Sequence, residues 1–191
     1  MLLEGPRSSE HLIPGLRALL SDFGWKLQDT SAVGVVAGPG SFTGARAGLA
    51  AAKALCEAGR ISLVAVSRLQ VLAHKAGPIT LPTHAFLDAG GGDLFHGAFA
   101  PGAPPLESLD SRDVALATAS MKGRAVVCED VVASALFDLN PVLLPALTAA
   151  DLVGIVSTRF KEQQMDDVAL SDVLYLRRSD LEIRSTRTQK A

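Results

Sequence analysis

The sequence predicts an α/β protein, and two observations lead to this prediction. Short, wholly apolar runs at residues 32–37 and 61–66 are typical of strands buried on both faces. A segment with helical periodicity follows each run, and the order strand, helix, strand, helix predicts a parallel sheet with crossover helices. The chain has 191 residues, of which 48% are hydrophobic and 20% charged, so it is long enough to bury a core.

Three helices are expected in the first part of the chain. Residues 9–23 carry apolar side chains at helical spacing, which predicts an amphipathic helix. A longer helix at 43–58 follows the glycine-rich loop GPGSFTG, and Ser41 or Thr43 can cap it. A short helix is expected at 67–76, after the second strand.

The helix expected at 43–58 has one side made mainly of small residues. Gly44, Gly48, Ala51 and Leu55 recur on this side at helical spacing. Because three of these four side chains are small or absent, another helix could approach this side closely.

The segment 77–82 (GPITLP) holds two prolines and one glycine and is the best linker candidate. It divides the chain into an N-terminal lobe at 1–78 and a C-terminal lobe at 79–191. In the second lobe, strands at 84–88 and 93–99 are expected to form an antiparallel hairpin. The remaining expected elements are a strand at 124–128, helices at 131–139 and 148–160, a short last strand at 174–176, and a basic tail.

Composition and charge exclude several classes of protein. The formal net charge of −2 provides no global basic field for holding nucleic acid. Cys56 and Cys128 lie far apart with no CxxC pair, which argues against a disulfide scaffold or a zinc site. The opening residues do not have the pattern of a signal peptide, and the most apolar window, 131–150, is broken by two prolines. We therefore expect a cytoplasmic protein with no membrane segment.

The loop GPGSFTG, between an expected strand and an expected helix, is the most informative string. Its glycines permit a close backbone approach, so it could cradle an anion at a helix N-terminus. It could equally be a tight turn from strand to helix. It is not a Walker A loop, because Ala45 and Arg46 follow the last glycine instead of Lys and Ser or Thr.

The string DAGGGD at 88–93 also has two interpretations. It resembles the turn with which the actin and sugar-kinase superfamily holds a nucleotide phosphate and its metal, and it is also a plausible hairpin turn capped by Asp88. No matching first phosphate loop or adenosine loop is found elsewhere in the sequence. An ATP-dependent phosphotransferase that uses Asp88 therefore stays the alternative function.

The other candidate residues do not form a recognisable catalytic or metal-binding set. The four histidines show no metal-ligand spacing, and no nucleophile has a neighbouring base in sequence. We expect no catalytic residue, no metal and no cofactor. The residues alone favour a scaffold or partner protein over an enzyme.

Residues 32–73 resemble the TsaB (YeaZ) family, an accessory subunit of the bacterial machinery that makes threonylcarbamoyladenosine in tRNA. The resemblance rests on the family pattern GxGSFTGxRxGxxxAKxLA, followed by a strand and VSxLxxLA. Weaker resemblance extends over 8–20, 87–99 and 172–180. The motif residues in the loop and the first helical turns are Gly38, Gly40, Ser41, Phe42, Thr43 and Arg46.

The resemblance implies two actin-like (RNase H-like) lobes. Members of the family usually begin with a strand like ILAIDTS and its hairpin partner, so the first lobe is expected to lack its N-terminal strands. The paralogue TsaD is the catalyst, and its motif VNHLEAHL holds two metal-binding histidines. Arg68 and Leu72 stand at those positions here, in VSRLQVLA, which implies a catalytically silent relative.

The resemblance also implies the partners. The chain is expected to bind TsaD, together with TsaE and ATP, and to support transfer of the threonylcarbamoyl group to the adenosine beside the anticodon. A homodimer is possible, and tRNA is contacted only through the complex. The first two helices form the interface in the family, which places it here at Leu12, Leu16, Leu19, Gly44, Gly48, Ala51 and Leu55.

Overall fold

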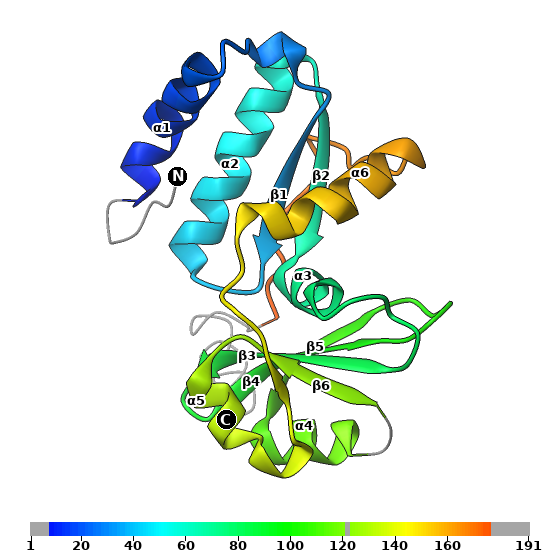
Figure 1. Cartoon of the computed structure of the whole chain (residues 1–191). Helices are drawn as coiled ribbons and strands as arrows, with labels where there is room; N and C mark the ends of the chain where they lie inside the picture. Colours follow the sequence, from blue (N-terminus) through cyan, green and yellow to red (C-terminus); the bar gives the residue numbers. More distant parts are fainter. Residues whose placement is uncertain (1–7, 121–122, 177–191) are drawn as a thin grey trace, which may run out of the picture.

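Two β-sheets organise the part of the chain that the computed structural model describes, residues 8–120 and 123–176 (Figure 1). In these residues the first sheet has two parallel strands, β1 (Ala32–Gly38) and β2 (Ser62–Ser67). Helix α2 (Phe42–Gly59) contacts β1 and β2 on one face, and α6 (Val153–Lys161) contacts both strands on the other. This strand, helix, strand order follows the sequence-based expectation.

The second sheet is mixed, with the strand order β5-β4-β3-β6-β7. β3 pairs antiparallel with β4 and parallel with β6, so the predicted hairpin is present and a crossover strand joins it. Its strands are β3 (Thr83–Gly90), β4 (Asp93–Phe99), β5 (Leu106–Ser111), β6 (Arg124–Val127) and β7 (Val142–Leu143).

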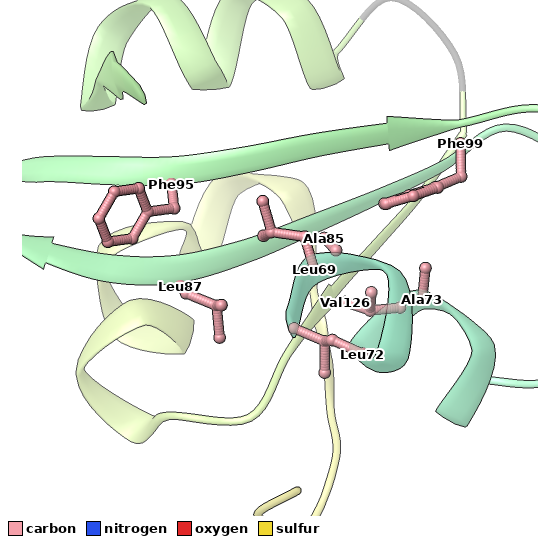
Figure 2. Close-up of a cluster of buried hydrophobic side chains, with 8 residues drawn as sticks. All are labelled: Leu69, Leu72, Ala73, Ala85, Leu87, Phe95, Phe99 and Val126. Atoms are coloured by element: carbon pink, nitrogen blue, oxygen red, sulfur yellow. The ribbon is translucent and has the colours of Figure 1, made fainter. Parts of the chain in front are cut away.

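Helices cover both faces of the second sheet. α3 (Arg68–Lys75) contacts β3 and β4, and Figure 2 shows Leu69, Leu72 and Ala73 of this helix against the sheet residues Ala85 and Val126. On the opposite face, Phe86 and Leu94 pack with residues of α4 (Arg112–Ala119) and α5 (Asp130–Ala135). Alternate residues of β3 therefore enter two different cores, as expected for a strand buried on both faces.

Hydroxyl side chains begin two of the helices, and the sequence predicts the first of these caps. Ser41 is the N-cap of α2, and Ser67 is the N-cap of α3, where its hydroxyl accepts a hydrogen bond from the amide of Leu69. Thr148 and Asp151 form a capping box at the 3-10 turn η3 (Ala149–Leu152), which leads directly into α6.

The chain returns to the first sheet after residue 148. α6 packs on β1 and β2, and beyond it Asp166 bridges to Leu63 while the amide of Leu174 donates to the carbonyl of Ala37. Residues from the far end of the sequence thus complete the core around the first sheet. The lobe boundary at 78/79 stays a prediction.

Three local expectations differ from the structure. Residues 174–176 form no strand, because the bond from Leu174 to Ala37 does not continue into a ladder. The helix expected at 131–139 is instead α5 followed by the 3-10 turn η2 (Phe137–Leu139). β5 and α4 were not expected at all.

Candidate partner-binding surface

The loop GPGSFTG joins β1 to α2 against the returning end of the chain. Gly38 has a φ of +122°, and a Cβ there would lie 2.8 Å from the carbonyl oxygen of Leu174. Glycine is therefore required at this position both by the backbone conformation and by the neighbouring segment. Gly40 lies beside the Arg68 guanidinium, which a Cβ on this residue would approach to 4.0 Å.

The hydroxyl of Ser41 makes the cap of α2. Its oxygen accepts a hydrogen bond from the amide of Gly44 at 3.4 Å, and its backbone carbonyl accepts from Ala45 at 2.9 Å. Thr43, the other capping candidate, is the second residue of the helix and is exposed. The loop thus uses its own side chain to satisfy a free amide of the first turn, as the tight-turn interpretation predicts.

Two residues of the motif form an exposed cluster with an unexpected third residue. The Arg46 guanidinium carbon lies 3.7 Å from the centre of the Phe42 ring and 5.3 Å from that of Tyr175. The two rings are 5.4 Å apart, and Arg46 Nε donates a hydrogen bond to the Tyr175 hydroxyl. We call these three residues the aromatic–arginine cluster. Phe42 and Tyr175 stay 52% and 42% exposed, so the cluster is available for contact with another molecule.

The apolar side of α1 (Ser8–Asp22) is only partly covered. α1 contacts α2, but none of the residues 10–22 is buried. Leu12 and Leu16 are partly buried, and Leu19 is 39% exposed. An amphipathic helix normally buries its apolar side, so this exposure marks a surface that can gain free energy by being covered.

The four predicted residues of α2 do not point into the sheet. Leu49, Ala52 and Cys56 form the buried side of the helix, packed with Leu63 of β2. Gly44 is exposed, and a Cβ on Gly48 would meet nothing within 4 Å. The remaining two predicted residues, Ala51 and Leu55, are partly buried.

A second aromatic pair lies just beyond the C-terminal end of α1. The rings of Phe23 and Trp25 are 5.9 Å apart, and the residues are 66% and 62% exposed. Trp25 and Tyr175 were not among the predicted site residues. Only the general tendency of Trp and Tyr to anchor interfaces could have pointed to them.

Comparisons with known proteins give the family of the chain. A family model described as "TsaD: tRNA N6-adenosine threonylcarbamoyltransferase" matches residues 5–105, more than half of the chain. The chain belongs to this family. Within it the chain is of the TsaB (YeaZ) type, as its relatives indicate.

One relative and two solved structures define these similarities. The tRNA threonylcarbamoyladenosine biosynthesis protein TsaB of Bacillus subtilis (strain 168) is 34% identical over 91 residues, which are 48% of this chain and only 40% of that protein. YeaZ from Pseudomonas aeruginosa has a TM-score of 0.73 at 22% identity, over 91% of this chain and 87% of that one.

The second solved structure is a Pseudomonas aeruginosa protein described as uncharacterized, with similarity to peptidase YEAZ. It has a TM-score of 0.72 at 22% identity, and the match covers 89% of this chain and 84% of that protein's chain. At this identity both structures show the fold alone. The predicted α/β, actin-like fold class is thereby confirmed.

Arg68 and Leu72, which the sequence resemblance places at the positions of the TsaD histidines, both have partners within this fold. Leu72 is fully buried in the core between α3 and the second sheet (Figure 2). Arg68 pairs with Glu129, with 3.1 Å between the guanidinium and the carboxylate. In the described ranges, 8–120 and 123–176, no three His, Cys, Asp or Glu side chains gather as metal ligands.

Asp88 closes the turn of the β3–β4 hairpin. Its carboxylate accepts a hydrogen bond from the amide of Gly90 at 2.8 Å, and its own amide donates to the Glu129 carboxylate at 2.9 Å. The hairpin turn expected at DAGGGD is thus present, and Asp88 caps it. Because Glu129 also holds Arg68, it links the end of β3 to the start of α3.

Two histidines face each other inside the second sheet. His84 Nδ1 and His96 Nε2 are 3.0 Å apart, and His96 Nδ1 lies 3.3 Å from the carboxylate of Asp110, which also accepts a hydrogen bond from Ser108. Burial lowers the pKa of His96; the hydrogen bond to Asp110 opposes this shift and the charge of His84 adds to it. His96 therefore stays neutral at pH 7.

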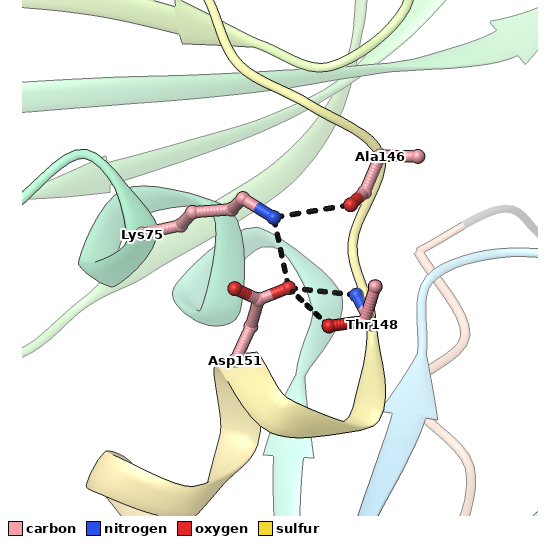
Figure 3. Close-up of polar contacts among 4 residues, drawn as sticks. All are labelled: Lys75, Ala146, Thr148 and Asp151. Carbon is pink, nitrogen blue, oxygen red and sulfur yellow. Dashed lines mark hydrogen bonds and ion pairs between the residues drawn. The ribbon is translucent and has the colours of Figure 1, made fainter. Parts of the chain in front are cut away.

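A groove of about 730 Å³ lies between α3 and α6. Lys75 lines it and donates to the carbonyl of Ala146 and to the carboxylate of Asp151, which also holds Thr148 (Figure 3). Arg159, a second basic residue of the groove, pairs with Asp166. Both cations are thus engaged within the fold.

None of the helices that the structure describes has the length and apolar character needed to cross a membrane.

Proposed function

We propose that this chain is a non-catalytic accessory subunit in the biosynthesis of threonylcarbamoyladenosine in tRNA. In this proposal it binds TsaD, with TsaE and ATP, and supports transfer of the threonylcarbamoyl group to the adenosine beside the anticodon. It acts in the cytoplasm and contacts tRNA only through the complex. Family membership and the relation to TsaB support the pathway.

One observation carries the proposal of a binding role: the apolar side of α1 is left without a buried residue at positions 10–22. Beside it, the open side of α2 at Gly48 leaves space in which another helix can pack. Exposed aromatic residues frame these helices, with Phe23 and Trp25 after α1 and Phe42 at the start of α2. Aromatic and arginine anchors around an apolar centre are typical of protein interfaces.

Two features support a non-catalytic role. Leu72 occupies the core with a side chain that cannot bind a metal, and Arg68 is a cation engaged with Glu129. In this proposal the chain contributes contacts and positioning, and the chemistry belongs to TsaD.

The test is size-exclusion chromatography with light scattering on this chain, alone and mixed with TsaD from the same organism. We expect a stable heterodimer. Leu19→Glu should weaken it by at least about tenfold, because it places a charge in an apolar contact. Ser21→Glu, an exposed residue on the opposite side of α1, is the matched control and should bind like the wild type.

Gly48→Leu gives a second, independent variant. The added side chain meets no atom of this chain within 4 Å of its Cβ, so the melting temperature of the chain alone should not fall. The heterodimer should be lost, because the side chain would fill the space in which the partner helix packs. A well-folded chain that ignores TsaD, or variants that bind it like the wild type, would refute this surface.

A further inference from the structure

Three large apolar side chains are exposed on α5, the turn η2 and β7. Val131 of α5 is 65% exposed, Phe137 of η2 is 80% exposed, and Leu143 of β7 is 50% exposed. α5 contacts β7, so these residues belong to one packed unit. Leu143 is in register with Val127, which packs in the same core as α5, and it therefore lies on the α5 face of the sheet. We call these three residues the α5–β7 surface.

The fold does not use these three side chains. α5 turns Val132 toward the core of the second sheet, and Leu136 follows on the same side, one turn later. The neighbouring Val131 and Phe137 face solvent instead. One exposed apolar residue needs no explanation, but three on one helix–strand unit can stabilise a contact that removes their apolar area from water.

The chain around this surface is acidic. Residues 125–158 contain no lysine, arginine or histidine, and their acidic residues are Glu129, Asp130, Asp138 and Asp151. Glu129 and Asp151 form ion pairs with cations of α3. Asp130 begins α5 and Asp138 follows Phe137; both are exposed, and no cation in the described ranges 8–120 and 123–176 pairs with them. Two free carboxylates therefore lie on either side of the exposed apolar residues of α5 and η2.

The last described residues lie close to the start of α5. A Cβ on Gly38 would meet the carbonyl of Leu174 at 2.8 Å, so the returning chain passes the loop GPGSFTG. Arg68, which lies beside this loop at Gly40, pairs with Glu129, the residue before α5. Leu176 then packs on the core between α3 and the second sheet. The segment that follows Leu176 thus begins near Asp130.

This segment, residues 177–191, has the composition that complements the surface. It lies outside the described part of the chain, and its sequence is RRSDLEIRSTRTQKA. It carries five basic and two acidic side chains, whereas the protein as a whole has a net charge of −2. Its large apolar residues, Leu181 and Ile183, stand between two arginines that precede them and two that follow.

We propose that residues 177–187 bind to the α5–β7 surface of their own chain, running alongside α5 in the same direction. The first two arginines then lie near Asp130. Leu181 and Ile183 cover the exposed apolar side chains, and the later arginines lie near Asp138. The order of charges and apolar residues along the segment thus matches the order along α5 and η2.

The distances allow this arrangement. An extended chain from residue 177 to 183 reaches about 23 Å, whereas a helix over 131–137 rises only about 10 Å. The segment is tethered to the same chain, so its local concentration at the surface is on the order of millimolar. Even a contact of modest affinity is therefore occupied. The contact does not involve α1 or α2, so it is independent of the proposed TsaD surface.

The test is nitrogen-15 relaxation on the full chain, without TsaD and without RNA. We expect the amides of Leu181 and Ile183 to have order parameters near the rigid value of about 0.85, whereas flexible segments lie below about 0.6. Phe137→Ser should lower them into the flexible range, because it removes the most exposed apolar side chain of the surface. Val153→Ser, at a 61% exposed position of α6, is the matched control and should leave them unchanged.

A reciprocal variant locates the contact from the other side. Ile183→Ser should shift the amide resonances of Val131, Phe137 and Leu143, because the side chain proposed to cover them is removed. The resonances of Val153 and its neighbours on α6 should stay in place. High salt should also lower the order of the segment, since the pairs with Asp130 and Asp138 are exposed to solvent.

Several results would overturn the proposal. Order parameters like those of a free peptide of sequence 177–191 would show that the segment does not bind. Order that survives Phe137→Ser, with no shift at the surface in Ile183→Ser, would place the segment elsewhere on the molecule. Order that appears only on addition of RNA would assign the arginines to phosphate binding. Order that rises with protein concentration would assign the contact to another molecule.

Discussion

His96 lies within hydrogen-bonding distance of His84 on one side and Asp110 on the other, with only 4% of its side chain exposed. If its Nδ1–H donates to Asp110, its Nε2 accepts from His84. The lone pair of Nε2 is then used in this hydrogen bond and is not available for a proton. A proton added to His96 would therefore replace a hydrogen bond between β3 and β4 by a repulsion.

This arrangement predicts a stability that depends on pH. Because the pKa of His96 is lower in the folded state than the ordinary value of 6.5, the unfolded chain binds more protons below that value. The free energy of unfolding should be at its full value above pH 6.5 and fall as the pH falls below it. Urea unfolding at a series of pH values measures this.

The variant His96→Gln should reduce the slope of this dependence. Its free energy of unfolding should change less between neutral and mildly acidic pH than that of the wild type. His11→Gln, on the exposed part of α1, is the control and should leave the slope unchanged. An equal slope in His96→Gln and the wild type would show that His96 does not cause the pH dependence of stability.

At the scale of elements, the start of η3 and α6 depends on one carboxylate. Partial burial by itself would raise the pKa of Asp151, but the hydrogen bonds from Thr148 and Lys75 outweigh it and lower that pKa. The same carboxylate oxygen accepts from the amide and hydroxyl of Thr148 and from Lys75 of α3 (Figure 3). Asp151 thus joins the cap at the start of η3 to the C-terminal end of α3.

Asp151→Asn should destabilise the chain by about 1–2 kcal/mol, since it weakens a capping box and removes an ion pair with little solvent exposure. Thermal unfolding compared with the wild type measures this loss. Glu162→Gln, an exposed residue of the same groove, is the control, and we expect no measurable change. A variant of Asp151 as stable as the wild type would show that the cap is dispensable.

Elements with strong local signals could be predicted from the sequence. The structure contains the wholly apolar strands, the capped start of α2 and the hairpin of β3 and β4. Each of these features depends on residues that are close together in the sequence. β5 could not be predicted, because it follows a proline-rich loop, begins with the 68% exposed Leu106 and has no buried residue. Pairing with β4 makes it a strand.

The candidate surface also combines a local feature, which could be predicted, with a contact between distant segments, which could not. The spacing of Gly44 and Gly48 indicated a helix side free of bulk; a Cβ on Gly48 would meet nothing within 4 Å, whereas one on Gly44 would contact Ser41. Tyr175 could not be placed beside Arg46, because 129 positions separate the two residues and no periodicity connects them. Only the folded chain brings them together.

At the scale of the whole molecule, one lysine joins the returning segment 163–176 to helix α2. Lys53 of α2 donates to the carbonyl oxygens of Ala169 and Ser171, at 3.2 and 2.9 Å. Lys53→Met keeps the aliphatic stem and removes both bonds. We expect faster proteolytic cleavage within 163–176, because the segment loses its anchor while the core of α2 is retained.

Limited proteolysis followed by mass spectrometry locates the cleavage. Lys161→Met, an exposed residue at the end of α6, is the matched control and should be cleaved at the wild-type rate. Equal cleavage of Lys53→Met and the wild type would show that the other contacts suffice, such as the bond from Leu174 to Ala37.

The return of the chain to the first sheet also has a consequence for biosynthesis. The strands β1 and β2 leave the ribosome early, but α6, which covers one of their faces, is translated about ninety residues after β2. Until then the apolar face of Val64 and Val66 has Val71 of α3 beside it but lacks Leu152 and Ile155, which complete this core. The second sheet, whose strands and covering helices lie between residues 68 and 143, can assemble first. The half of the molecule that is synthesised first is therefore the half that finishes folding last.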